Sequence, residues 1–300
     1  LRDGRSVGTG RMSETTLGQI VRLMVGRELA ELFPRLPHAV GEPILQVRGL
    51  AGADLPDDVG FDLHRGEILG IAGLVGSGRS ESLRALFGLQ PVRSGTVTVR
   101  GQSLRVTALR PARALRHGLD LLSENRKEEG LAVRLPVRVN TGLSSLGRWS
   151  RLGVVSARRE AEATRHWLQT LAVKHASLEQ PVGALSGGNQ QKVALARILM
   201  HDSDILLLDE PTRGIDVGSK AEICRLVGEL AARGKAIVMV SSYLPELLGV
   251  CDTLAVMHRG VLSPVRPVAA WTEEAVMLYA TSGKLAPPAP GMRSPQPCPA

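Results

Sequence analysis

The chain has 300 residues, of which 43% are hydrophobic, so it can form one large domain or two small ones with a sizeable core. No apolar stretch approaches the roughly 18 residues that a membrane helix needs, and a role at a membrane would therefore require a partner. The net charge of +8 comes from scattered arginines, and only 3% of the residues are aromatic, so a platform that stacks nucleic-acid bases is not expected.

The first residues indicate the end of a repeat. Residues 1–5 (LRDGR) predict a strand end and a tight turn, and residues 257–261 (MHRGV) have the same form. A polar segment followed by an apolar helix comes next in both places, at 13–24 and from 272 onward. We therefore expect a repeat whose first copy is incomplete in this sequence. The alternative is a free-standing protein with an N-terminal helical extension.

An extended linker and short strands follow. Prolines at 34, 37 and 43 predict the linker. Short strands are expected at 44–47 and 59–63, and alternation of apolar and polar residues predicts another at 96–99.

A glycine-rich loop, GLVGSGRS, lies between the apolar run at 68–72 and a predicted helix. Its glycines let backbone N–H groups converge on phosphate oxygens, and the helix N-terminus adds partial positive charge. Strand, loop and helix together are the context that a phosphate-binding loop requires, whereas a plain turn is the alternative. The predicted binding residues are Gly73, Gly76, Ser77, Gly78, Arg79 and Ser80.

Residues 133–185 are expected to form a helical subdomain, and from Ser156 onward their pattern follows helical spacing. Ser186, Gly187 and Gly188 then open a helix that should run to residue 200. Backbone N–H groups and a serine hydroxyl at a helix start suit an oxyanion, because the N–H groups are unpaired donors at the positive end of the helix dipole. A flexible turn before a helix is the alternative.

The short apolar run at 205–208 predicts a strand buried on both faces, as in a parallel sheet covered by helices. Asp209 and Glu210 follow it, where ligands bind in open α/β sheets. An acidic pair there can hold Mg²⁺ through its waters and activate a hydrolytic water. An acidic turn without such a role is the alternative. Further on, 219–222 (SKAE) predicts a capping box that starts a helix, and 236–240 the next buried strand.

These motifs resemble the nucleotide-binding domains of ABC transporters. The resemblance is carried by the glycine loop, by LSGGNQQK at 185–192 and by DEPTRGID at 209–216, and it covers roughly residues 1–284. LSGGNQQK and the run SENRK at 123–127 resemble in particular the importers of simple sugars of the ribose, xylose and galactose type. The resemblance implies an α/β fold: a P-loop NTPase (ABC ATPase) core with a mainly parallel sheet, an antiparallel β subdomain and a helical subdomain at about 133–185.

Importers of this type carry two nucleotide-binding domains in tandem on one polypeptide. The resemblance implies that residues 1–38 are the tail of a preceding nucleotide-binding domain and a linker, and that residues 39–284 form an ABC nucleotide-binding domain. Residues 285–300 are dominated by proline and by small or polar residues, so we expect a disordered tail there.

The implied function is that of an ATP-binding and ATP-hydrolysing subunit that energises import of a simple sugar across the cytoplasmic membrane. Its cofactors would be ATP and Mg²⁺, and it would lie peripherally on the cytoplasmic face of the cell membrane. The expected partners are a tandem or paired nucleotide-binding domain, membrane permease subunits and, indirectly, a periplasmic or extracellular sugar-binding protein. Nucleic acid is not expected.

The resemblance also assigns roles to single residues. Ser80 and Asp209 would hold Mg²⁺, and Glu210 would activate the attacking water. Glu124 is the nearest candidate for a glutamine that touches both Mg²⁺ and the membrane subunit. A charged surface loop around Glu124 is the alternative.

The signature motif would serve a different nucleotide. In ABC pairs the signature of one domain caps the γ-phosphate that is bound by the other domain. Ser186, Gly187 and Gly188 would therefore act on the nucleotide of the paired domain. Asp216 stands where ABC dimers place a contact across the interface.

Three residues depart from the family pattern. Arg79 replaces the usual P-loop lysine, Ser242 replaces a catalytic histidine that contacts the γ-phosphate, and Asn125 replaces an aspartate. Losing one preorganised donor to a transition state costs on the order of 10²–10³ in rate. We therefore expect an asymmetric pair, with a degenerate site in this domain and an intact signature that serves the partner.

Other functions stay open at this point. One is a non-transport ABC ATPase acting on ribosomes or DNA, which the positive charge permits. Another is a regulatory module that binds nucleotide without hydrolysing it, which Arg79 and Ser242 favour. Importers of nucleosides also have tandem domains, and the motifs separate them poorly from sugar importers.

Overall fold

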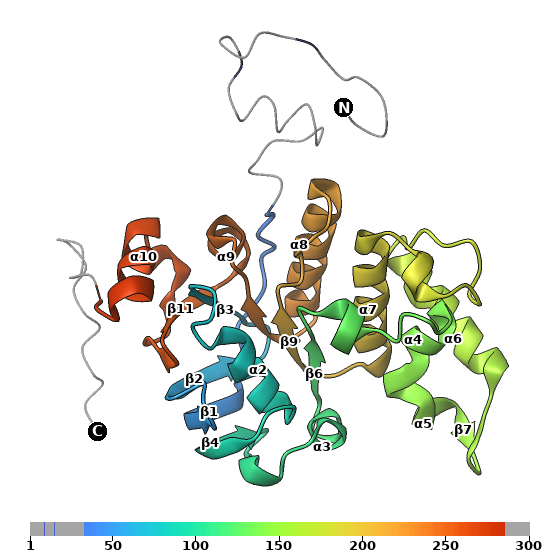
Figure 1. Ribbon diagram of the computed structural model, residues 1–300, viewed down its shortest axis with the longest axis horizontal. Coiled ribbons are helices and arrows are strands. Elements are labelled where there is room, and N and C mark those ends of the chain that lie inside the picture. The colour runs from blue at the N-terminus through green and yellow to red at the C-terminus, as the bar shows by residue number, and fades with distance from the viewer. Residues whose placement is uncertain (1–8, 10–14, 16–32, 286–300) are drawn as a thin grey trace.

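The structure is a computed structural model that describes residues 9, 15 and 33–285 (Figure 1). The expectations for the other residues of 1–32 and for the tail at 286–300 lie outside this part of the chain. A seven-stranded sheet runs through the middle of the domain, a four-stranded sheet lies beside it, and a group of helices lies to one side (Figure 1).

Parallel strands with apolar runs form the centre of the large sheet. In spatial order its strands are β12 (Val261–Leu262), β11 (Thr253–His258), β3 (Ile68–Gly73), β10 (Ala236–Val240), β9 (Ile205–Asp209) and β6 (Leu119–Leu122), with β13 (Arg266–Pro267) also paired to β11. The neighbours from β11 to β6 pair in parallel, whereas β12 and β13 are antiparallel to β11. β9 and β10 are buried at every position, as predicted for strands covered on both faces.

The second sheet is antiparallel throughout. Its strands lie in the order β2 (Val59–His64), β1 (Pro43–Gly52), β4 (Val92–Val99) and β5 (Gln102–Leu104). The predicted strands at 44–47, 59–63 and 96–99 all belong to it, so the predicted antiparallel β subdomain is confirmed.

Helices cover both faces of the central sheet and enclose two separate cores. One core joins the antiparallel sheet to α2 (Arg79–Phe87) and α3 (Pro111–Arg116). The other core joins α7 (Gly187–His201), α8 (Val217–Ala232), α9 (Leu244–Val250) and α10 (Glu273–Ser282). Alternate residues of one strand point to different cores: Ile237 and Met239 of β10 belong to the second, and Val238 to the first.

The helical group at the side contains α4 (Val137–Gly142), α5 (Leu146–Trp149) and α6 (Ala157–Thr170) (Figure 1). A hairpin of β7 (Ser150–Arg151) and β8 (Val154–Val155) interrupts it, which helical spacing did not predict. Its two turn residues, Leu152 and Gly153, both have positive φ, as in the tight turns that match strand twist.

Single turns complete the described part. A π-helical turn spans Arg126–Gly130, and 3₁₀ turns span Val106–Ala108, Leu143–Ser145, Val182–Ala184 and Val268–Ala270. Among the described residues, no helix has the length and apolar character needed to cross a membrane.

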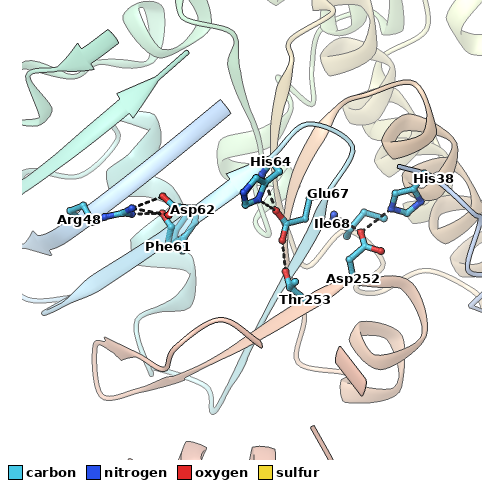
Figure 2. Close-up of polar contacts among 9 residues, drawn as sticks. All are labelled: His38, Arg48, Phe61, Asp62, His64, Glu67, Ile68, Asp252 and Thr253. Carbon is cyan, nitrogen blue, oxygen red and sulfur yellow. Dashed lines mark hydrogen bonds and ion pairs between the residues drawn. The ribbon is translucent and has the colours of Figure 1, made fainter. Parts of the chain in front are cut away.

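Two carboxylates fix the amino ends of β3 and β11 (Figure 2). Asp252 accepts a hydrogen bond of 2.9 Å from the Ile68 N–H and lies 2.8 Å from His38 Nε2. Glu67 accepts 2.7 Å from Thr253 Oγ1 and pairs with the His64 ring at 2.7 Å. The linker residue His38 is thereby tied to the edge of the sheet opposite the carboxyl ends.

We expect Asp252→Ala to lower the free energy of unfolding by about 2–3 kcal/mol, because a buried N–H and a buried histidine both lose their acceptor. Asp62→Ala is the matched control, since it removes another carboxylate drawn in Figure 2, one that forms an exposed ion pair with Arg48. That change should cost less than about 1 kcal/mol. Urea unfolding of the three proteins measures both values, and equal losses would contradict the role given to Asp252.

Candidate functional site

A cavity of about 530 Å³ lies at the carboxyl ends of the central strands. The order of the parallel strands brings the ends of β3, β9 and β10 together there, as in other open α/β sheets. The predicted site residues that line the cavity are Gly76, Ser77, Arg79, Ser80, Glu124, Glu210 and Ser242. The candidate site is therefore assembled from segments far apart in the sequence.

The glycine loop needs glycine at positions where the backbone has positive φ. Gly76 and Gly78 have φ of 76° and 106°, a region that other residues rarely adopt. A Cβ built on Gly78 would lie 3.3 Å from the Gly260 Cα, so the turn after β11 packs closely against the loop. The Gly260 N–H donates to the Ser77 carbonyl at 2.7 Å and holds the two together.

Gly73, at the end of β3, also has positive φ and a tight neighbourhood. A Cβ built there would lie 2.7 Å from the Met257 carbonyl oxygen and 2.8 Å from Ser77 Oγ. Gly73 is not among the residues that line the cavity. Gly73 therefore allows the chain to turn from β3 into the glycine loop, and it is not placed to contact a ligand in the cavity.

Arg79 is buried at the start of α2, with only 7% of its surface exposed. Its Nη1 donates to the Ser241 carbonyl at 2.9 Å, and its Nη2 lies 3.8 Å from Glu210 Oε1. Burial lowers the pKa of Arg79, and the negative charges of Glu210 and Asp209 oppose that effect. Because arginine stays protonated in proteins, a full positive charge lies beside the cavity.

Ser80 and Asp209 meet below the glycine loop. Ser80 Oγ donates to Asp209 Oδ1 at 3.0 Å. Burial raises the pKa of Asp209 to about 6, although the Ser80 hydrogen bond acts in the opposite direction. No group of three or more His, Cys, Asp or Glu side chains in the described part could hold a metal ion. A hydroxyl and one carboxylate suit Mg²⁺, which usually takes its other ligands from waters and phosphates.

Glu210 begins the turn after β9 and has a φ of 48°, which is uncommon for a residue other than glycine. Ser242 Oγ donates to its Oε2 at 3.2 Å. Burial raises the pKa of Glu210, and the bond from Ser242 and the charge of Arg79 counter it. A buried carboxylate with a raised pKa is suited to accept a proton.

Glu124 follows β6 and forms an ion pair with Arg213, and both residues line the cavity. The sequence prediction missed Arg213, although it belongs to the DEPTRGID motif. It also missed Arg84 and Gln90, which line the cavity and carry no motif. Asn125, next to Glu124, accepts a bond from the Glu128 N–H and caps the π-helical turn.

The signature residues lie away from this cavity. Ser186 is the N-cap residue of α7, and Asn189 Nδ2 donates to its Oγ at 2.9 Å. A Cβ built on Gly187 would lie 2.8 Å from Arg126 Nη2, and one built on Gly188 would lie 3.3 Å from a serine hydroxyl of α8. At both positions the first atom that a new Cβ would meet is the end of a side chain, so the signature packs closely against side chains of the neighbouring segments.

Asp216 caps α8. Its Oδ1 accepts from the Ser219 N–H at 2.9 Å, and its Oδ2 accepts from Ser219 Oγ at 2.8 Å. The helix therefore begins at Val217, and the capping box predicted from Ser219 to Glu222 is wrong. Asp216 does not line the cavity, so its predicted contact across an interface stays a prediction.

We expect Asp209→Asn to stabilise the ligand-free chain, because a raised pKa means that burial disfavours the ionised carboxylate. For a folded pKa of about 6 against 3.8 unfolded, the cost grows as pH rises from about 4 to 6 and is complete above that range. The gain in unfolding free energy should be about 3 kcal/mol at pH 7.5 and about 1 kcal/mol at pH 4.5. Urea unfolding at the two pH values measures it, and a gain that is larger at pH 4.5 would contradict the assignment.

Comparison with known proteins places this geometry in a family. A family model described as ABC transporter matches residues 56–213. The ribose import ATP-binding protein RbsA of Oceanobacillus iheyensis is 43% identical over 94% of this chain and 57% of its own length. A putative ribose/galactose/methyl galactoside import ATP-binding protein of Burkholderia lata is 46% identical over 94% and 55%. The xylose import ATP-binding protein XylG of Burkholderia ambifaria is 46% identical over 87% and 52%.

The chain thus spans about half the length of these curated relatives. Among solved structures, the ADP conformation of MJ1267, an ATP-binding cassette of an ABC transporter, has a TM-score of 0.64 at 22% identity and covers 81% of this chain and 97% of its own. The dimeric MJ0796 cassette with ADP and Pi has a TM-score of 0.65 at 19% identity, covering 75% and 99%. The predicted P-loop α/β fold is confirmed, and the chain belongs to the ABC transporter family of ATP-binding proteins.

Proposed function

We propose that the chain binds ATP with Mg²⁺ in this cavity, as the ATP-binding subunit of an importer for a simple sugar. The observation that carries the proposal is the hydrogen bond between Ser80 and Asp209. In P-loop NTPases a loop hydroxyl and a strand-end aspartate hold the Mg²⁺ that accompanies the nucleotide. The sugar class rests on the relatives, whose names are those of ribose, galactose and xylose import proteins.

The glycine loop would hold the phosphates. Its backbone N–H groups lie at the N-terminus of α2, where the helix dipole favours negative charge. The Arg79 guanidinium would add a full charge from the side of β10. When bound, Mg²⁺ would neutralise phosphate charge next to Ser80 and Asp209.

Glu210 would act as the base that accepts a proton from the attacking water. Its raised pKa suits a proton acceptor, and Ser242 holds one carboxylate oxygen in place. The hydroxyl of Ser242 donates to Glu210, and serine has no second donor on its side chain for a γ-phosphate. Ser242 would therefore orient the base, Glu210. It would not replace the hydrogen-bond donor that a histidine at this position would offer to the transition state.

Turnover at this site should be low. Arg79 donates to a main-chain carbonyl and lies close to Glu210, so its charge is shared between the base and any phosphate. The same two contacts favour the alternative of a regulatory module that binds nucleotide and does not hydrolyse it. In the proposed pair, Ser186, Gly187 and Gly188 would complete the more active site on the paired domain.

The proposed partners follow from the relatives' length and names. They are about twice as long as the matched region and are import proteins. A tandem or paired nucleotide-binding domain, membrane permease subunits and, indirectly, a periplasmic or extracellular sugar-binding protein would complete the system, with this subunit on the cytoplasmic face of the membrane. An importer of nucleosides is the nearest variant of the proposal.

We expect the chain to bind MgATP and Arg79→Ala to weaken that affinity by about 10- to 100-fold, since a charge-assisted contact to phosphate is lost. Arg48→Ala is the control, because it removes an exposed arginine whose partner is Asp62 on β2, outside the cavity lining. Isothermal titration calorimetry with MgATP measures both affinities. Equal affinities for wild type and Arg79→Ala would remove Arg79 from the site.

In the full-length protein we expect Glu210→Gln to keep most of the ATP hydrolysis and Gly187→Asp to remove most of it. The first change disables the base of the slow site, whereas the second places a negative charge where the signature would meet a phosphate. At Gly187 a new side chain first meets the flexible end of Arg126, so the fold should tolerate it. Steady-state phosphate release decides the matter: complete loss in Glu210→Gln would mean that this domain holds the active site.

A further inference from the structure

Glu246 is a buried carboxylate next to the turn that brings Ser242 into the cavity, and it has no part in the proposed chemistry. Glu246, in the first turn of α9, has none of its surface exposed and does not line the cavity. Its Oε2 accepts a 2.6 Å hydrogen bond from Ser241 Oγ, and its Oε1 accepts one of 3.4 Å from Cys224 Sγ. Within the described residues, Glu246 forms no ion pair with a cation. Burying a carboxylate in this way costs several kcal/mol.

The contacts of Glu246 lead straight to the cavity. The hydroxyl that it holds belongs to Ser241, whose carbonyl accepts the 2.9 Å bond from Arg79 Nη1. The Tyr243 N–H donates to the same hydroxyl at 3.1 Å, so the Ser241 side chain is fixed from both directions. Between these two residues stands Ser242, which donates to Glu210.

We propose that Glu246 is a positioning residue for the nucleotide site, because its hydrogen bond with Ser241 fixes the turn after β10. In this fixed turn the Ser241 carbonyl accepts from Arg79, and the Ser242 hydroxyl donates to Glu210. This inference rests on the proposed function, because it assigns Glu246 to the same ATP site. A turn fixed before the ligand arrives spares the cost of ordering Arg79 on binding. The buried charge is then the cost of a preorganised phosphate-binding group.

The test breaks the hydrogen bond between Ser241 and Glu246 from either side, and calorimetry measures the MgATP affinity of the 300-residue chain. Glu246→Leu removes the acceptor, and Ser241→Ala removes the donor. Each should weaken MgATP binding by about five- to tenfold, and the double variant should be no weaker than either one, because both changes break the same link. Glu246→Gln should restore affinity to within about twofold, since its amide oxygen can still accept from Ser241.

Cys224→Ser is the matched control, because it changes the partner of the other carboxylate oxygen and leaves Ser241 in contact. Its MgATP affinity should equal that of wild type. Thermal unfolding of every variant shows whether it is folded. Glu246→Leu removes a buried charge, so its Tm should not fall in step with its affinity.

Two results would overturn the inference. One is a lower Tm with unchanged MgATP affinity in Glu246→Leu and Ser241→Ala, which would make Glu246 a structural residue only. The other is full additivity in the double variant. If Glu246→Leu fails to fold, Ser241→Ala against Cys224→Ser decides alone. A wild-type chain that binds no MgATP would refute the proposed function itself, whereas wild-type binding that Arg79→Ala weakens and Ser241→Ala does not would refute only the role of Glu246.

Discussion

The buried guanidinium of Arg79 is the constraint on which the candidate site depends. A charge at 7% exposure is tolerable only where acceptors surround it, and here these are the Ser241 carbonyl and, more distantly, Glu210. The acceptors come from segments more than a hundred residues further along the chain, and the parallel order of β3, β10 and β9 brings them to one edge of the sheet. The glycine loop, Glu210 and the turn after β10 are thereby fixed relative to one another. An apolar residue at position 79 would form neither the hydrogen bond to the Ser241 carbonyl nor the ion pair with Glu210.

Much of the fold and part of the site could be predicted from the sequence, because they depend on local patterns. The apolar runs at 205–208 and 236–240 gave buried parallel strands, and the glycine loop stands at the end of another strand, in the context that its residues imply. The hairpin at 150–155 was not predicted, because its two-residue strands are too short for a period and its turn uses Leu152 with Gly153. The capping box failed because Asp216, three residues before its first member, has the better-placed acceptor for the Ser219 N–H.

The contacts that set the chemistry of the site were beyond sequence reasoning, since they join residues with no fixed spacing. Glu124 pairs with Arg213, and the Arg79 guanidinium donates to a main-chain carbonyl, an acceptor that every residue carries and that no motif marks. The motifs alone show that arginine stands in place of lysine at position 79 and serine in place of histidine at position 242. The structure adds that both side chains lie against the same carboxylate, that of Glu210. On the proposed function, the departures therefore act together and not as two independent losses.

The division of the molecule into two cores has a consequence for its motions. Alternate side chains of β3, β9 and β10 belong to different cores, so neither core can open without stripping one face of the same strands. Amide hydrogens of these strands should therefore exchange with solvent only through global unfolding, while those of the short hairpin β7–β8, whose tip is almost fully exposed, exchange through local fluctuations. The loops of the cavity are thus anchored to the part of the chain that should exchange most slowly, whereas the hairpin β7–β8 belongs to the helical group at the side (Figure 1).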